Sequence, residues 1–119
     1  MKTLLMTLLL SAMPALAFAA DEPFACNMRA LTKSERSHHG MLSRQLLSSA
    51  QGKRELEDGY ELRFPAELWL PAAQWAALER KCCPFFAFEL KCAIRGGPTW
   101  LRITGPVGAK AFMHDELGL

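Results

Sequence analysis

The sequence predicts a small α+β domain in which helices pack on one face of a small antiparallel sheet. Some segments repeat their apolar residues at helical spacing, and others alternate apolar and polar residues as strands do. Short turn signals separate these segments, and no repeat or low-complexity tract interrupts them. The expected element order is α-β-α-β-β-α, with room for an extra arm at one sheet edge.

The start of the chain predicts export. Lys2 precedes an apolar run over residues 4–10, and Ala17-Phe18-Ala19 has the small-x-small pattern that a signal peptidase accepts. The run stops at Ser11, well short of the roughly 20 residues that cross a membrane. We therefore expect residues 1–19 to be a cleaved signal peptide. The mature protein is expected to be periplasmic or secreted, without stable membrane insertion.

Residues 20–119 are expected to form a single α+β domain, because about 100 residues suffice for one modest core. Lysine and arginine total 14 in the whole chain against 12 acidic residues. No basic run or interleaving of aromatic and basic residues appears. These features exclude nucleic acid as an expected partner.

The first helix is predicted over residues 33–49. Thr32 and Glu35 have the spacing of a capping box, and Gly52 follows as a stop signal. Its apolar residues recur at helical spacing: Met41, Leu42, Leu46 and Leu47.

A strand follows, because Tyr60, Leu62 and Phe64 alternate with charged residues. Asp58-Gly59 is a tight-turn pair, so residues 54–56 are a candidate first arm of a hairpin.

The second helix begins near Pro71, which suits a first turn. Trp75, Leu78 and Cys82 share helical spacing and should be buried together. Pro84 ends the helix, which places Cys83 at its exit.

The last part of the chain predicts a hairpin and a helix. Alternation over residues 86–94 places Cys92 on the core face, and the turn at 95–98 leads to a return strand at 100–104. Gly105-Pro106 opens a final helix.

Cysteine carries most of the chemical information. Four cysteines in an exported chain of this size first suggest disulfides, as a pair of bridges or as one bridge plus a buried thiol. Cys82 and Cys83 at a helix exit also suggest a soft-metal site, which Cys26 would complete with a third sulfur. Thiol redox chemistry is a third interpretation, although a helix C-terminus disfavours a thiolate and no Cys-x-x-Cys spacing is present.

The remaining polar residues form no complete catalytic signature. His38 and His39 are adjacent on the first helix and do not face one point, so structural roles are favoured over metal ligation. Glu79 precedes Cys83 by four residues and is positioned to orient or deprotonate a thiol. A binding protein is therefore favoured over an enzyme.

Three segments carry a family resemblance: residues 26–32, residues 60–65, and residues 78–90 with the core Glu79-Arg80-Lys81-Cys82-Cys83-Pro84-Phe85. The chain resembles a group of small bacterial proteins that is similar to a domain attached to some mercury-resistance-type (MerR-like) regulators. The resemblance implies that Cys26, Cys82 and Cys83 form a shared thiol set for handling soft metals. The export signal and Cys92 depart from the pattern of that group.

The expected function is binding of a thiophilic ion through thiolates of Cys26, Cys82 and Cys83, with the metal ion as the partner. Copper, zinc, mercury and arsenite all accept cysteine sulfur. A periplasmic thiol–disulfide redox protein and a disulfide-stabilised structural or interaction domain are the alternatives.

Overall fold

The structure, a computed structural model, describes residues 24–119. The predicted signal peptide and its cleavage site lie outside the described residues. The elements are a 3-10 turn η1 (Met28–Ala30), α1 (Lys33–Ser49), β1 (Gly52–Leu56), β2 (Gly59–Phe64), a second turn η2 (Ala66–Leu68), α2 (Trp69–Cys82), β3 (Ala87–Cys92), β4 (Thr99–Thr104) and α3 (Ala109–Leu117).

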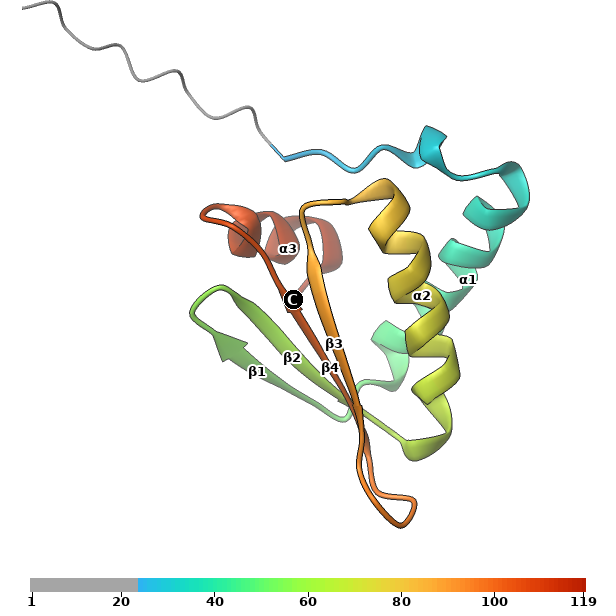
Figure 1. The fold of residues 1–119 in the computed structure, drawn as a ribbon, viewed down its shortest axis with the longest axis vertical. Coiled ribbons are helices and arrows are strands. Elements are labelled where there is room, and N and C mark those ends of the chain that lie inside the picture. Colours follow the sequence, from blue (N-terminus) through green and yellow to red (C-terminus); the bar gives the residue numbers. More distant parts are fainter. Residues whose placement is uncertain (1–23) are drawn as a thin grey trace, which may run out of the picture.

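The four strands form one antiparallel sheet in the order β1-β2-β4-β3 (Figure 1). Two hairpins, β1–β2 and β3–β4, lie side by side and join through the β2–β4 pair. The expected α+β class is confirmed, and the arm suggested at 54–56 is the full strand β1. The chain therefore runs α-β-β-α-β-β-α, with one strand more than the main prediction contained.

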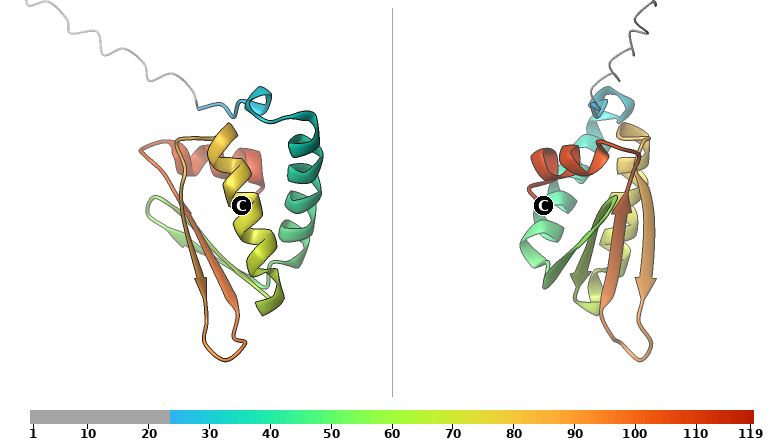
Figure 2. Two further views of the ribbon diagram at one scale, coloured as in Figure 1. Left: turned by 45° about the vertical axis from the view of Figure 1, so that its right-hand side comes forward. Right: turned by 90° about the vertical axis from the view of Figure 1, so that its left-hand side faces the viewer.

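All three helices contribute to a core on one face of the sheet (Figure 2). The alternation in β2 and β4 produces this core, because every second side chain points to the same face. From the helices, the buried residues include Leu42, Leu46, Trp75, Leu78, Cys82, Ala109 and Met113. From the sheet, they include Tyr60, Leu62, Phe64, Leu101 and Ile103.

The start of α1 agrees with the sequence. The Thr32 hydroxyl accepts a hydrogen bond from the Glu35 amide at 3.1 Å, and the Glu35 carboxylate accepts one from the Thr32 amide at 3.1 Å. Both halves of the predicted capping box are therefore present, and they satisfy two amides that the first turn leaves free.

The turn before β2 lies one residue earlier than expected. Glu57 and Asp58 form it, and Gly59 is already paired with Leu56 across the hairpin. A Cβ atom at Gly59 would lie 1.9 Å from the carbonyl oxygen of Ile103. Glycine is therefore required here by the close approach of β4, not by the turn itself.

Cys92 is opposite the buried Thr99, so it lies on the core side of the sheet as predicted, but it is not buried. Cys92 is the last residue of the edge strand β3, and its side chain is exposed. Figure 1 shows the end of the β3–β4 hairpin extending beyond the helices. Alternation assigned the face of the sheet but not how far the helices reach along it.

Among the described helices, none combines the length and the hydropathy that crossing a membrane requires.

Candidate functional site

The residues of greatest chemical interest meet in a pocket at the C-terminal end of α2. The pocket has a volume of about 370 Å³. We call it the sulfur pocket and define it by its polar residues Cys26, His39, Glu79, Cys82 and Cys83. Its apolar wall includes Phe24, Phe86, Phe112 and Leu117. In Figure 1 this is the region where the end of α2 lies beside the first described residues.

The end of α2 brings the cysteine pair to the pocket. Cys82 is the last helical residue and lies on the buried stripe, as predicted. Cys83 is the C-cap, and its amide donates a 2.6 Å hydrogen bond to the Glu79 carbonyl. Both side chains are 1% exposed, and their sulfur atoms lie 3.7 Å apart. The proline that follows ends the helix and fixes the direction in which the chain leaves.

The segment before η1 supplies the third sulfur. The Asn27 amide donates a 2.7 Å hydrogen bond to the Cys82 carbonyl, which holds this segment across the helix end. Cys26 is then joined to Cys83 in a disulfide, with 4.6 Å between their Cα atoms and a separation of 57 positions in sequence. The three predicted site residues therefore lie together.

The disulfide changes what these sulfurs can do. Cys26 and Cys83 are not thiols in this form, and Cys82 is the thiol that remains in the pocket. Of the arrangements that the sequence left open, the structure has one disulfide plus a buried thiol. A three-thiolate site requires reduction of the Cys26–Cys83 bond. The observed state is compatible with a redox role or with a disulfide-stabilised fold.

A histidine–glutamate pair lies beside the sulfurs in the pocket. Nε2 of His39, on α1, lies 2.5 Å from Oε1 of Glu79, on α2. The two side chains are 14% and 3% exposed, so the contact is largely removed from water. Within residues 24–119, the other carboxylate oxygen, Oε2, is buried without a hydrogen-bond partner. A buried polar atom of this kind is rare and requires an explanation.

The position of His39 is set by its neighbours. Its ring stacks near that of Trp75, with centroids 6.4 Å apart and 17° between the planes. The Trp75 indole donates a 2.9 Å hydrogen bond to Ser43, whose hydroxyl donates to the His39 carbonyl at 2.8 Å. This network ties α1 to α2 at the level of the pocket.

Two overlapping groups of side chains have atoms close enough to hold one ion. Cys26, Glu79 and Cys83 form one group, and His39, Glu79 and Cys82 form the other. Within each group the candidate ligand atoms lie within 4.8 Å of one another. Glu79 belongs to both groups, so its carboxylate is the centre of the arrangement.

The environment keeps the remaining thiol protonated. Burial raises the pKa of Cys82, and the nearby Glu79 carboxylate raises it further. The end of α2 adds the negative pole of the helix dipole. An activated cysteine nucleophile needs the opposite, a lowered pKa next to a positive group. The interpretation of Glu79 as a group that deprotonates a thiol is therefore not supported for Cys82.

A surface ion pair braces the same helix end. Nζ of Lys81 lies 2.5 Å from Oε2 of Glu35 in the capping box. The hydrogen bond from Lys81, followed by that from the Thr32 backbone, lowers the pKa of Glu35. One carboxylate thus caps α1 and binds the last turn of α2.

Two residues of this site have a larger role than their sequence patterns predict. Adjacency to His38 predicts a structural role for His39, and the spacing to Cys83 predicts only thiol chemistry for Glu79. One signal was available: Glu79 lies directly beside the apolar stripe of Trp75, Leu78 and Cys82. A carboxylate at a buried helix position is uncommon unless it is paired. Its pairing with His39 depends on how α1 packs on α2, which no local pattern contains.

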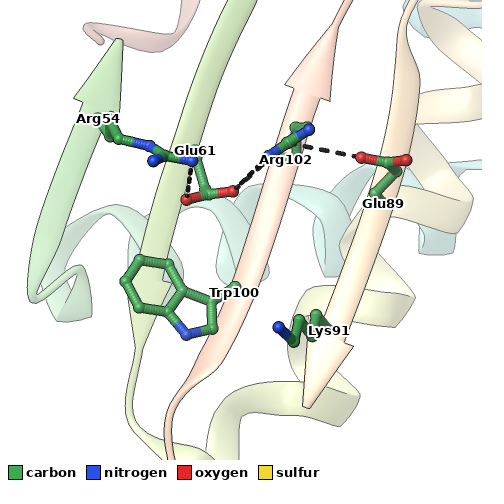
Figure 3. A pocket seen from close by; sticks show the side chains of 6 residues that line it. All are labelled: Arg54, Glu61, Glu89, Lys91, Trp100 and Arg102. Atoms are coloured by element: carbon green, nitrogen blue, oxygen red, sulfur yellow. Dashed lines mark hydrogen bonds and ion pairs between the residues drawn. The ribbon is translucent and has the colours of Figure 1, made fainter. Parts of the chain in front are cut away.

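A second, larger hollow lies on the outer face of the sheet and has a volume of about 430 Å³ (Figure 3). Glu61 lies 3.0 Å from Arg54 and 3.1 Å from Arg102, which also approaches Glu89 at 3.5 Å. The ion pairs run across all four strands, and Arg54 is exposed whereas Arg102 is partly exposed. This arrangement is that of a solvated sheet face, so the larger hollow is not the candidate site.

Comparisons with protein-family models, with curated proteins and with solved structures found no match for this chain. The resemblance to the group of small bacterial proteins that share the Cys82-Cys83-Pro84-Phe85 core therefore stays a prediction.

Proposed function

We propose that this protein binds a thiophilic metal or metalloid ion in the sulfur pocket when the Cys26–Cys83 disulfide is reduced. The ligands are the thiolates of Cys26, Cys82 and Cys83. One observation carries the proposal: sulfurs from two segments far apart in sequence meet in one pocket, beside a buried carboxylate oxygen that has no partner among the described residues. Soft ions such as Cu(I), Hg(II) and arsenite select sulfur ligands, and Zn(II) accepts them.

The electrostatics of the pocket favour a cation over a catalytic thiol. The raised pKa of Cys82 makes it a poor nucleophile at neutral pH. A bound cation has the opposite effect, because it displaces the thiol protons and neutralises the charge of the thiolates and of Glu79. The negative surroundings that disfavour a free thiolate therefore favour a bound positive ion.

While the disulfide is intact, Cys26 and Cys83 cannot act as thiolate ligands, so this form does not offer the three-sulfur site. A dithiol reductant converts the Cys26–Cys83 bond into two thiols and is itself oxidised to a disulfide, so two electrons and two protons are transferred. Ion binding afterwards releases the protons. When no ion is bound, exchange with a disulfide-containing oxidant restores the bond, and the oxidant takes up the two electrons and two protons and becomes a dithiol. An exported location suits this cycle, because disulfides form and persist in oxidising compartments.

A thiol–disulfide exchange protein is the second candidate function, and the position of Cys26 favours it. Cys26 is only partly buried, whereas Cys83 is 1% exposed. A partner thiolate would attack the Cys26 sulfur, form a mixed disulfide there and release Cys83 as the leaving thiolate. In this candidate function Cys82 is not required, which separates it from metal binding.

An equilibrium titration of the reduced protein tests the proposal. The probe is Cu(I), added under anaerobic conditions with a fixed non-thiol reductant and a chromophoric competitor. We expect Cys82→Ser and Cys83→Ser to lose most of the affinity and Cys26→Ser a large part, each by about tenfold or more. The matched control is Cys92→Ser, the same change at an exposed cysteine outside the pocket, and it should bind as the unmodified protein does.

Two outcomes decide against metal binding. If Cys92→Ser weakens Cu(I) binding as much as Cys82→Ser does, the pocket is not the site. If the reduced protein binds no Cu(I) but exchanges its Cys26–Cys83 disulfide rapidly with a small dithiol, the redox candidate replaces the proposal.

A further inference from the structure

The group His39, Glu79 and Cys82 has a property that the three-sulfur set lacks. None of its members takes part in the disulfide. Its ligand atoms lie within 4.8 Å of one another while the Cys26–Cys83 bond is intact. This group is thus assembled in the oxidised protein, without any reduction step.

The buried carboxylate is the independent sign that this group holds a ligand. Glu79 is 3% exposed, and its Oε2 finds no partner among the residues that the structure describes. A buried carboxylate needs full pairing or a coordinated metal to offset its loss of hydration. In the metal-free protein, Nε2 of His39 pairs with one carboxylate oxygen, and the structure describes no partner for the other. A bound ion would replace the Nε2 proton, so the imidazole and the carboxylate would both contact the ion in place of their hydrogen bond.

The mixture of ligand atoms identifies the class of ion. An imidazole nitrogen, a carboxylate oxygen and a thiolate sulfur together suit a borderline divalent cation, and Zn(II) takes all three. A soft monovalent ion such as Cu(I) prefers sulfur alone. Three protein ligands also leave a fourth position, and the pocket of about 370 Å³ has room for a solvent molecule there.

The surrounding packing places these ligands on rigid elements. His39 comes from α1, and Glu79 and Cys82 lie one turn apart on α2. The Trp75–Ser43 hydrogen bond and the Lys81–Glu35 ion pair hold the two helices together on either side of the group. Sites on packed helices keep their ligand geometry better than sites on loops.

We infer that His39, Glu79 and Cys82 form a metal site of their own for a borderline divalent cation such as Zn(II), and that this site works while the disulfide is intact. The pocket then has two binding modes that share Cys82. The oxidised protein offers nitrogen, oxygen and one sulfur, and the reduced protein offers three sulfurs. The redox state of one disulfide thereby selects the class of ion.

The test uses the disulfide-intact protein, with Zn(II) as the probe in competition with a chromophoric chelator. Cobalt(II) replaces Zn(II) in a parallel titration, because a thiolate ligand produces a sulfur-to-cobalt charge-transfer band. We expect one equivalent of Zn(II) to bind and the cobalt form to show the band. His39→Gln, Glu79→Gln and Cys82→Ser should each weaken Zn(II) binding by about 10–100-fold or more.

Two matched controls accompany these variants. His38→Gln is the same substitution at the adjacent histidine, which is outside the group, and Cys92→Ser is the same change at an exposed thiol. Both should keep full Zn(II) affinity. Glu79→Gln is nearly isosteric, so circular dichroism should show an unchanged fold and its loss of binding should reflect the ligand.

The double variant Cys26→Ser/Cys83→Ser separates this inference from the proposed function. It cannot form the three-sulfur site, yet it retains His39, Glu79 and Cys82, so Zn(II) binding should persist while Cu(I) binding is lost. The inference is overturned if oxidised protein binds no Zn(II) above the level of Cys82→Ser. It is also overturned if His38→Gln loses as much affinity as His39→Gln, or if the cobalt form lacks the thiolate band.

Discussion

Two regions of this fold contain clustered charged groups, and they differ in how completely a carboxylate is paired. On the outer face of the sheet, Glu61 has Arg54 and Arg102 as partners, one on each carboxylate oxygen (Figure 3). In the sulfur pocket, Glu79 is buried and has a partner on one oxygen only among residues 24–119. Natural structures rarely keep an unpaired buried group without a reason. Incomplete pairing, more than the size of a hollow, is therefore our ground for choosing the sulfur pocket as the candidate site.

The two regions also differ in how they hold the fold together. The sheet face uses ion pairs between the largely covered Glu61 and arginines that reach solvent, and pairs with solvent-accessible partners contribute little individually and are screened by salt. The pocket uses a covalent bond between residues 57 positions apart. Each prediction below changes one of the two regions and measures the difference, beginning with the largest expected effect.

Loss of the disulfide should be the most damaging change. Closing a loop of this length removes chain entropy from the unfolded state worth about 4 kcal/mol in the standard model. Cys26→Ser should therefore lower the free energy of unfolding by roughly this amount, as should addition of a reductant to the unmodified protein. Urea unfolding monitored by tryptophan fluorescence measures both. The control Cys92→Ser should change stability by less than about 0.5 kcal/mol, since its side chain is exposed.

That control also tests the corrected position of Cys92. A residue in the strand core would lose stability on substitution with serine, and an exposed residue at the end of β3 would not. A loss of about 2 kcal/mol in Cys92→Ser would contradict the exposed position.

Alkaline pH should destabilise the folded protein through Cys82. Its pKa is raised in the folded state by burial and by Glu79, so the unfolded chain loses this proton at lower pH than the folded chain does. The stability is fully present below the ordinary thiol pKa, and it falls as pH rises from there toward the folded pKa. The slope there should approach about 1.4 kcal/mol per pH unit. Urea unfolding across that pH range measures it, and Cys82→Ala should remove the slope; an unchanged slope in this variant would assign the effect to another group.

Glu79→Gln should stabilise the disulfide-intact, metal-free protein by about 1 kcal/mol. The amide keeps a hydrogen bond to His39 and removes a buried charge whose second oxygen has no partner in the described chain. Thermal unfolding in the presence of a chelator measures the change. A destabilised variant would mean that the Glu79 charge is fully compensated and that the pocket does not differ from an ordinary buried ion pair.

Glu61→Gln on the sheet face should have a smaller effect of the opposite sign. It removes ion pairs to the exposed Arg54 and the partly exposed Arg102, for a loss of about 0.5 kcal/mol that shrinks further at high salt. The same unfolding experiment at low and high salt measures it. A salt-independent loss of several kcal/mol would show that the ion pairs on this face contribute strongly to the stability of the fold.

Much of the fold could be predicted because its signals are local. The capping box at Thr32 and Glu35 and the apolar spacing behind it located α1 at its observed bounds. Alternation in residues 60–64 identified the core face of β2. The same reasoning did not predict that Cys92 is exposed, because coverage of a strand end depends on where the helices stop. That is a property of the assembled layers, which a two-residue period cannot contain.

The site could be predicted in part for the same reason. The helix exit aimed Cys82 and Cys83 at one region, and Cys26 joins them there. The sequence left the pairing of the thiols open, since it depends on how residues 24–31 cross the end of α2. The His39–Glu79 contact was also missed, because it needs the packing of α1 on α2. The one local indication was the position of Glu79 beside the buried apolar residues of α2.

X-ray absorption at the copper edge of the Cu(I)-loaded, reduced protein tests the central claim most directly, because it reads the ligands of the ion. We predict a first shell made of sulfur, which loses sulfur in Cys26→Ser and in Cys82→Ser but is unchanged in Cys92→Ser. A shell of nitrogen and oxygen alone, or a sulfur shell that changes only in Cys92→Ser, would contradict the assignment of the sulfur pocket as the binding site.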